Sequence, residues 1–333
     1  MKRAQVSDIL PPDVSQAETS ARLRVIPSPD EKGFLYPELL KPVPTKVIEA
    51  IGKIAGTNVD VELTIEGPAD AEQAVDDSLL LVAGGYFGPE PAYDDYRSEL
   101  AQRGKWVATW NAARSTGFWS DIALLNVLHP QILASRTALG VVRAAEEEGF
   151  TSFDGSGHSN GFQTIVELAR YRPRLLRTIT GLGGVGLDEH SFLEMAPRLA
   201  NFARKDLARP RIAKLILRPE MAKKEAEYLL ANMSLTATEM YSAGSCDMRE
   251  HVTTLRRRYG IPIGAIQYQE DDFFPLEAVE RDSKHLLDVF HVFRDPKVRH
   301  TGPQEDPSGS AAAQLEVLDE LIGILRANEK IAA

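Results

Sequence analysis

The sequence is poor in the features that mark several common classes of protein. Its 333 residues include one cysteine, Cys246, so an internal disulfide cannot form and a C-x-x-C metal or redox site is excluded. No apolar run is long enough to cross a bilayer. Pro11 and Pro12 follow the basic start before any signal-peptide core could form. We therefore expect a soluble protein of a reducing cytoplasm.

An excess of basic charge is also missing. The chain has 38 Lys and Arg against 48 Asp and Glu, a net charge of -10, which argues against nucleic-acid binding. The basic amphipathic stretch 203–219 could face a membrane or an anionic substrate. Such a run is more often a helix with one solvated charged face, so we expect no membrane contact.

What the sequence does contain is an alternation of strand-like and helix-like segments. Residues 79–83 form a continuous apolar run that ends at two glycines, and residues 105–112 are similar. Such runs are typical of strands buried on both faces of a parallel sheet. Residues 59–65 alternate apolar and polar side chains, as half-buried strands do. Further strands are expected just before Ser159 and at 174–184, 261–269 and 286–293, with helices at 131–147, 163–171 and 311–328.

This alternation predicts an α/β fold with a mostly parallel, doubly wound sheet. It stops after about residue 187, where consecutive helical stretches follow without a strand between them. An all-helical block within such a pattern is typical of a cap over the carboxyl edge of the sheet, where ligands bind. We predict an irregular arm at 1–45 with one possible strand at 21–26, a core at 46–187 and 258–333, and a helical cap or lid at 188–257.

The most informative motif lies between a strand-like run and a helix. Gly157, Ser159 and Gly161 have G-x-S-x-G spacing. A serine hydroxyl is a poor nucleophile unless a base takes its proton. A serine on a tight strand-to-helix turn is exposed to substrate, and the crowding there requires small residues two positions before and after it. The alternative interpretation is a flexible loop that contains serine and glycine.

The segment 155–186, GSGHSNGFQTIVELARYRPRLLRTITGLGGVG, closely resembles the nucleophile-elbow region of the α/β-hydrolase superfamily. That family usually has Gly-His-Ser-x-Gly there, then a helix with a small residue near Ala169 and a proline like Pro173. The resemblance extends over most of 78–187 and 258–330. It covers neither the N-terminal arm nor, in any subfamily that we can name, the helical insertion.

The resemblance implies a triad in the chain order serine, acid, histidine. The acid should follow the strand after the cap, where Glu270, Asp271 and Asp272 precede Pro275. We choose Asp271, four residues before the proline, with Asp272 and Glu270 as alternatives and a solvated acidic turn as the non-functional interpretation. His300 lies between the last expected strand and the final helix, where the family has its base. His158 is expected to be structural, and we assign no catalytic role to His129, His190, His251, His285 or His291.

The resemblance also implies an oxyanion hole made of two backbone N–H groups. One belongs to Asn160, which follows the serine. The other comes from the loop at 83–88, which resembles the family's His-Gly-Gly loop with Ala83 in place of histidine. Gly85 or Tyr86 would donate, unless this is a plain glycine-rich turn.

No cofactor or metal is expected. Residues 181–186, GLGGVG, match G-x-G-x-x-G, but a dinucleotide site also needs a following helix, another strand and an acidic residue about 20 positions on. Asp206 has nearly that spacing but lies among helical residues, so we interpret the glycines as a turn from the sheet into the cap. No H-E-x-x-H metal motif is present. Trp110, Phe118 and Trp119 could line an acyl pocket or pack in the core.

Together these features predict a serine hydrolase that acts on a small-molecule ester or acyl substrate through an acyl-enzyme, esterase-like or lipase-like. The same triad could instead cleave carbon–carbon or amide bonds or transfer acyl groups, because the fold does not decide the reaction. A protein that binds a ligand without turning it over is the alternative of another class. A homodimer contact is one conceivable role of the N-terminal arm.

Overall fold

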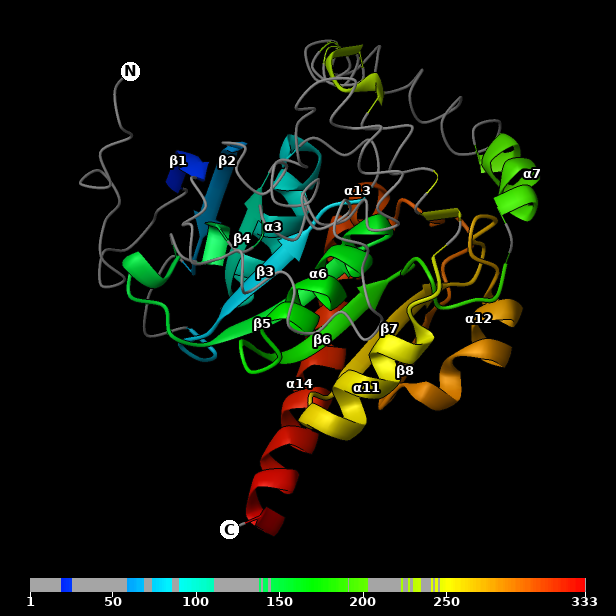
Figure 1. The fold of residues 1–333 in the computed structure, drawn as a ribbon. Helices are drawn as coiled ribbons and strands as arrows, with labels where there is room; N and C mark the ends of the chain where they lie inside the picture. Colours follow the sequence, from blue (N-terminus) through cyan, green and yellow to red (C-terminus); the bar gives the residue numbers. More distant parts are fainter. Residues whose placement is uncertain are drawn as a thin grey trace, which may run out of the picture.

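A computed structural model describes residues 19–25, 59–68, 74–85, 90–110, 145–190, 192–202 and 246–332, with individual residues within 138–142 and 223–244. These residues form one eight-stranded sheet in the order β1-β2-β4-β3-β5-β6-β7-β8 (Figure 1). The strands are β1 (Thr19–Val25), β2 (Val59–Glu66), β3 (Leu79–Ala83), β4 (Trp106–Trp110), β5 (Phe153–His158), β6 (Leu176–Leu182), β7 (Ile263–Tyr268) and β8 (Val289–Phe293).

The sheet is mixed at one edge and parallel elsewhere. β2 runs antiparallel to both of its neighbours, β1 and β4. The other neighbouring pairs are parallel. The register sets Ala83 opposite Gly157 and Leu182 opposite His158. The carboxyl ends of β3, β5 and β6 therefore meet at one edge of the sheet.

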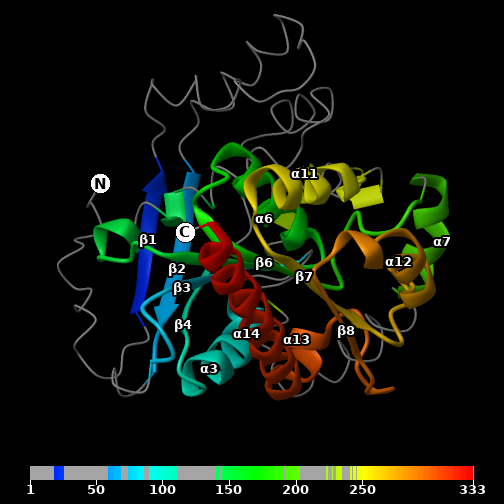
Figure 2. The same cartoon turned by 90° about the horizontal axis from the view of Figure 1, so that it is seen from below.

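Helices cover both faces of the sheet (Figures 1 and 2). α6 (Asn160–Tyr171) packs on β3, β5 and β6, with α11 (Arg249–Tyr259) beside it. On the opposite face, α14 (Pro307–Ala332) packs on β6, β7 and β8 and on α3 (Asp94–Gln102). Further helices are η4 (Glu90–Tyr93), α7 (Phe192–Phe202), α12 (Leu276–Asp282), η6 (Lys284–Leu286) and α13 (Gly302–Glu305).

The two-sided cover explains the apolar run of β3. Successive strand side chains point to opposite faces. Leu79 and Leu81 join the hydrophobic cluster under α6, whereas Leu80 and Val82 join the cluster under α3 and α14. Burying each such side chain contributes about 1.5–3 kcal/mol, so β3 is held from both sides and its carboxyl end is a firm support for the loop that follows.

The predicted fold class is confirmed, and each expected strand is present. β1 overlaps the strand expected at 21–26 within the arm. α11, which the sequence placed at the end of the insertion, packs against α6 and contributes Val252 and Leu255 to the core. Most of the expected cap, including 203–222, lies outside the described residues, so the division into domains stays a prediction. Among the described residues, no helix combines the length and apolar character needed to cross a membrane.

Candidate active site

Ser159 stands on a strained turn between β5 and α6. Its φ is 52° and its ψ is -122°, and no other non-glycine residue in the described part of the chain has a positive φ. Such a conformation costs about 1–3 kcal/mol and persists only where surrounding structure imposes it. Here the Ser159 N–H donates to the Leu182 carbonyl at 2.9 Å, and the Phe162 N–H donates to the Ser159 carbonyl at 3.1 Å.

The two glycines of the motif are required by contacts with the backbone. A Cβ at Gly157 would lie 2.2 Å from the Phe162 nitrogen, and a Cβ at Gly161 would lie 2.1 Å from the Ala83 oxygen. Backbone atoms cannot move aside as a flexible side chain can. The G-x-S-x-G spacing is therefore explained by the close approach of the start of α6 to β5 and to the end of β3.

The structure brings Ser159, His300 and Asp271 together in a hydrogen-bonded row. The His300 Nε2 lies 2.7 Å from the Ser159 Oγ, and the His300 Nδ1 lies 2.9 Å from the Asp271 Oδ2. All three residues are buried. A carboxylate can only accept, so the Nδ1 carries the proton and the Nε2 lone pair faces the serine hydroxyl. This is the arrangement of a nucleophile, a base and an orienting acid.

Local geometry distinguishes Asp271 from its two acidic neighbours. The Asp271 Oδ1 accepts the backbone N–H groups of Phe273 and Phe274 at 2.8 and 3.0 Å, a turn that aims the other oxygen at His300. Asp272 is half-buried and pairs with Arg299 at 3.0 Å, and Glu270 is exposed. Asp271, the first choice from the sequence, is thus the acid that reaches the histidine.

His300 is held between aromatic rings and a glycine. The centroids of Phe273 and Phe274 lie 5.2 and 5.4 Å from that of His300. Gly183 has a φ of 54°, and a Cβ there would lie 3.2 Å from both the Asp271 Oδ2 and the His300 Nδ1. The glycine run at 181–186, interpreted as a turn into the cap, thus also makes room for the triad. No helix follows β6 before α7 within the described residues, and Asp206 lies outside them.

Two of the expected oxyanion donors, Asn160 and Gly85, lie beside Ser159. Asn160 follows Ser159 directly and begins α6. Gly85 is close enough that a Cβ there would lie 2.9 Å from the Ser159 Cβ. Its N–H, however, donates to the Tyr93 Oη at 2.6 Å. η4 brings this hydroxyl to the Gly85 amide, and Tyr86 lies outside the described residues, so the donor from this loop stays a prediction.

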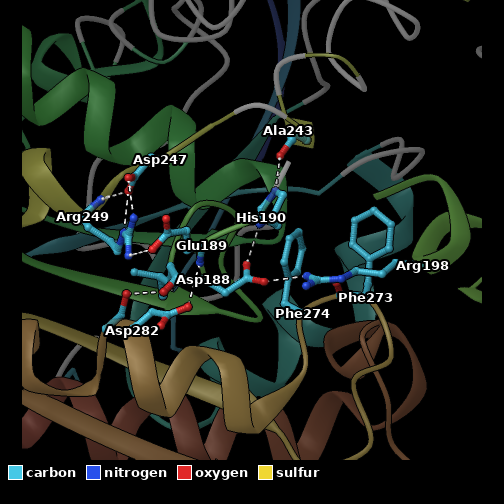
Figure 3. A network of polar contacts seen from close by, with 12 residues as sticks. Asp188, Glu189, His190, Arg198, Ala243, Asp247, Arg249, Phe273, Phe274 and Asp282 are labelled. Carbon is cyan, nitrogen blue, oxygen red and sulfur yellow. Dashed lines mark hydrogen bonds and ion pairs between the residues drawn. The ribbon is translucent and has the colours of Figure 1, made fainter. Parts of the chain in front are cut away.

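A polar network ties the expected cap to the loop that carries the acid (Figure 3). Asp188, which is buried past the end of β6, contacts the His190 Nδ1 at 3.0 Å and the Arg198 Nη1 at 2.5 Å. The His190 Nε2 lies 3.2 Å from the Ala243 carbonyl, and the Arg198 Nη1 donates to the Phe273 carbonyl at 3.2 Å. The network thus holds α7 and residue 243 against the segment beside His300.

Burial disfavours a charge on His190, but Asp188 beside it outweighs that effect and raises the pKa of the imidazole. The geometry agrees, because both ring nitrogens face pure acceptors, a carboxylate and a carbonyl. Only the imidazolium can donate to both. No motif in the sequence indicated this role for His190.

One group among the described residues has the donor atoms for a metal ion. His291, Glu316 and Glu320 place one ligand atom each within 4.8 Å of one another, on β8 and α14. None belongs to the triad row, and the two glutamates are exposed. The 2.8 Å contact of His291 with Glu320 is explained equally well as a surface ion pair.

The comparisons with known proteins agree on the architecture. No protein-family model and no curated protein matches the sequence. The structure is similar to a thermophilic esterase from Thermogutta terrifontis, with a TM-score of 0.57, 14% identity, and 90% of this chain and 99% of that chain covered. The chain has the α/β-hydrolase fold.

Two further structures with this fold come from different reaction classes. An enol-lactonase from Burkholderia xenovorans LB400 matches with a TM-score of 0.57 and 12% identity, over 78% of this chain and 97% of that chain. A proline iminopeptidase from Mycobacterium smegmatis matches with a TM-score of 0.56 and 15% identity, over 81% of this chain and 97% of that chain. The α/β-hydrolase fold here is thus similar to that of enzymes acting on quite different bonds.

Proposed function

We propose that this protein is a serine hydrolase that cleaves a small carboxylic ester through an acyl-enzyme. The observation that carries the proposal is the row from the Ser159 Oγ to the His300 Nε2 at 2.7 Å, and from the His300 Nδ1 to the Asp271 Oδ2 at 2.9 Å. The row ends on a serine held at a positive φ. The structural similarity to an esterase and an enol-lactonase supports ester chemistry.

Each step follows from the proton positions. His300 Nε2 takes the Ser159 hydroxyl proton while Oγ attacks the ester carbonyl carbon, giving a tetrahedral oxyanion and an imidazolium. Asp271 stabilises the imidazolium and fixes its orientation. The tetrahedral adduct collapses, the carbon–oxygen bond to the alcohol breaks, and the Nε2 proton passes to the leaving oxygen. Water then repeats the sequence on the acyl-enzyme, releasing the acid and restoring Ser159.

The positive end of α6 favours the developing oxyanion. Asn160, as the first residue of that helix, would offer one backbone N–H. A second donor would come from the loop after β3. Of the two candidates there, Tyr86 keeps the expected role, because the Gly85 N–H is held by the Tyr93 Oη.

Hydrolysis of p-nitrophenyl acetate, butyrate and octanoate by the purified protein tests this proposal. We expect Ser159→Ala to lower kcat by about 10⁴-fold or more, because the remaining groups supply only residual catalysis. Ser152→Ala makes the same change at the other end of β5 and should retain wild-type rates. The acyl chain length that is hydrolysed fastest would indicate the size of the acyl pocket.

Turnover that survives Ser159→Ala, or a folded wild-type protein that turns over none of the esters, would contradict the esterase proposal. Substrates with amide or activated carbon–carbon bonds would then be tried on the same variants. Ligand binding without turnover would favour the non-catalytic alternative.

A further inference from the structure

A second hydrogen-bonded row runs beneath the triad and connects two segments that both touch Ser159. The Gly85 N–H donates to the Tyr93 Oη at 2.6 Å. The Tyr93 Oη lies 2.7 Å from the His158 Nδ1, and the His158 Nε2 lies 2.6 Å from the His300 carbonyl oxygen. Tyr93 and His158 are 2% and 3% exposed, so water does not compete for these bonds.

The two ends of the row set the direction of its outer hydrogen bonds. An amide N–H can only donate and a carbonyl can only accept, so the Tyr93 Oη accepts from Gly85 and the His158 Nε2 carries a proton that it gives to the His300 carbonyl. Tyr93 also bonds the Gln304 side chain. In the neutral imidazole the His158 Nδ1 has a lone pair, and the Tyr93 hydroxyl donates to it. The row thus assigns the neutral elbow histidine one tautomer, with its proton on Nε2.

The electrostatics of the site agree with this assignment. Burial lowers the pKa of His158 to about 3, and the nearby His300 adds to that effect. Burial likewise raises the pKa of Tyr93 to about 12, which keeps its hydroxyl protonated. Both groups thus hold one protonation state at neutral pH.

The row joins the loop after β3 to the loop that carries His300. Gly85 lies against Ser159, where an added Cβ would be 2.9 Å from the serine Cβ. The His300 ring contacts the serine Oγ, and the His300 backbone carbonyl accepts a hydrogen bond from His158. A shift of either segment would change the geometry in which the serine attacks.

We propose that Tyr93 and His158 are positioning residues that couple the loop at Gly85 to the backbone of His300, and so hold the nucleophile and base in register. This inference rests on the proposed serine hydrolase function. Neither residue touches the reacting atoms directly. A misplacement of about 1 Å at a reacting group can cost about 100-fold in rate, so the row should influence kcat more than KM.

The first arm of the test needs no catalysis. In the full-length protein with ¹⁵N-labelled histidine, NMR should show one histidine that stays neutral with its proton on Nε2 between pH 8 and pH 5, and whose signals vanish in His158→Gln. An Nδ1-protonated tautomer at His158, or its titration near the ordinary histidine pKa of about 6.5, would overturn the row as assigned. This result stands even if the wild-type protein turns over no ester.

The second arm breaks the row one bond at a time. His158→Asn places an amide near the Nδ1 position and keeps a partner for Tyr93, whereas His158→Gln places an amide near Nε2 and keeps a donor for the His300 carbonyl. We expect Tyr93→Phe to lower kcat about 10- to 100-fold with KM within about twofold. His158→Gln should lose less than His158→Ala, and adding Tyr93→Phe to His158→Gln should cost little more.

Tyr96→Phe is the matched control, since Tyr96 is a buried tyrosine of the adjoining helix α3 that takes no part in the row. It should keep the wild-type kcat. If Tyr93→Phe and Tyr96→Phe lower kcat equally, or if losses at Tyr93 and His158 simply add, the two residues only fill space and the proposal fails. Wild-type turnover that depends on Ser159 would still uphold the hydrolase proposal in that case.

Discussion

A polar cluster lies at each end of strand β5. The two clusters differ in how their charged groups are paired. At the amino end, the buried Asp154 contacts the Lys105 Nζ at 3.1 Å and the Arg177 Nη2 at 2.5 Å. At the carboxyl end, the Ser159 Oγ lies 2.7 Å from the His300 Nε2. The same strand therefore has a cluster of paired ions at its amino end and a strained turn that carries the serine at its carboxyl end.

In the amino-end cluster, the numbers of acidic and basic side chains are equal. Asp76 joins it through contacts of 2.8 Å with both Lys105 and Arg177, giving two acids for two bases. Burial opposes ionisation of Asp76, but hydrogen bonds from Lys105, Ser78 and Arg177 outweigh it and hold the pKa of that carboxyl well below its usual range. Every charge in this cluster has a partner of opposite sign, so the cluster can stabilise the fold.

The carboxyl-end cluster contains a hydroxyl beside its base, and the backbone of its serine is strained. The Asp271 carboxylate is satisfied by two backbone N–H groups and by Gln267 at 3.1 Å. His300 retains a basic nitrogen that faces a hydroxyl rather than an acid. Charges that are fully paired favour stability, whereas a base held against a weak acid favours proton transfer. Substitutions at the two ends of β5 should therefore have different effects.

The largest effect is expected at the triad acid. Asp271→Asn should lower kcat by about 10⁴-fold, because an amide no longer selects the histidine tautomer that accepts the serine proton. The free energy of unfolding should change far less than the rate. Ester hydrolysis and urea unfolding measure the two effects. Asp272→Asn is the matched control and should keep the activity, since Asp272 pairs with Arg299 instead; equal losses in the two variants would count against the assignment.

At the other end of β5, Asp154→Asn should act on stability and leave the chemistry of folded molecules unchanged. Lys105 would lose a buried partner, and breaking a buried ion pair costs about 3–5 kcal/mol. Urea unfolding should show that loss, with kcat per folded molecule retained. Glu280→Gln breaks the exposed pair with Lys284 and should cost at most about 1 kcal/mol. A large fall in kcat in folded Asp154→Asn protein would contradict the proposal that this cluster affects stability and not the chemistry.

The contacts of Gly183 with the triad can be tested separately from its backbone conformation, because Gly260, far from the triad, also has a positive φ. Gly183 and Gly260 have φ values of 54° and 69°, yet only Gly183 has neighbours within 4 Å of an added Cβ. Alanine at either position should cost about 1–2 kcal/mol of stability. Only Gly183→Ala should also lower kcat, by about 10-fold, since its methyl would press on Asp271 and His300. Equal kcat values for the two variants would refute the role given to Gly183.

The smallest effect is a pH dependence of stability at the cap network. His190 faces Asp188, the Arg198 guanidinium, the Ala243 carbonyl and the ring of Phe274. Its pKa is raised by Asp188 against the opposing effect of burial. The protonated form therefore stabilises the fold fully below the unfolded value of about 6.5, and the contribution is lost as the pH rises through the higher folded value.

Urea unfolding at several pH values should therefore show a decrease in stability from acidic to alkaline pH that His190→Gln removes. His285→Gln leaves this network intact and should keep the decrease. The difference between the variant and the wild-type curves isolates His190 from the other groups that titrate. A curve for His190→Gln that runs parallel to the wild type would contradict the imidazolium assignment.

The sequence predicted the strands well because their signals are local, and the three residues expected to form the triad lie within hydrogen-bonding distance of one another. The continuous run at 79–83 reflects two-sided burial, and the glycines around Ser159 reflect contacts with adjacent backbone. The choice among three neighbouring acids depended on a turn in which Phe273 and Phe274 donate to one carboxylate oxygen. That turn was suggested only by the spacing to Pro275.

What escaped sequence analysis depends on contacts between distant segments. Nothing in the loop after β3 indicates that Tyr93 will occupy the Gly85 amide. Nothing in the glycine run indicates that Gly183 will lie against residues more than 80 positions later. The cap network likewise joins Asp188 to residues of α7 and to Ala243. Such contacts are set by the packing of elements, which hydrophobic periodicity does not determine.

Labelling with a fluorophosphonate, followed by intact mass and peptide mapping, shows directly whether Ser159 is an activated nucleophile. We predict one adduct on the folded protein, at Ser159, and none in Ser159→Ala or His300→Ala or in protein unfolded in urea. An adduct at Ser159 that forms equally fast in His300→Ala would show that the histidine does not activate the serine. No adduct on the folded wild-type protein would contradict the nucleophile assignment itself.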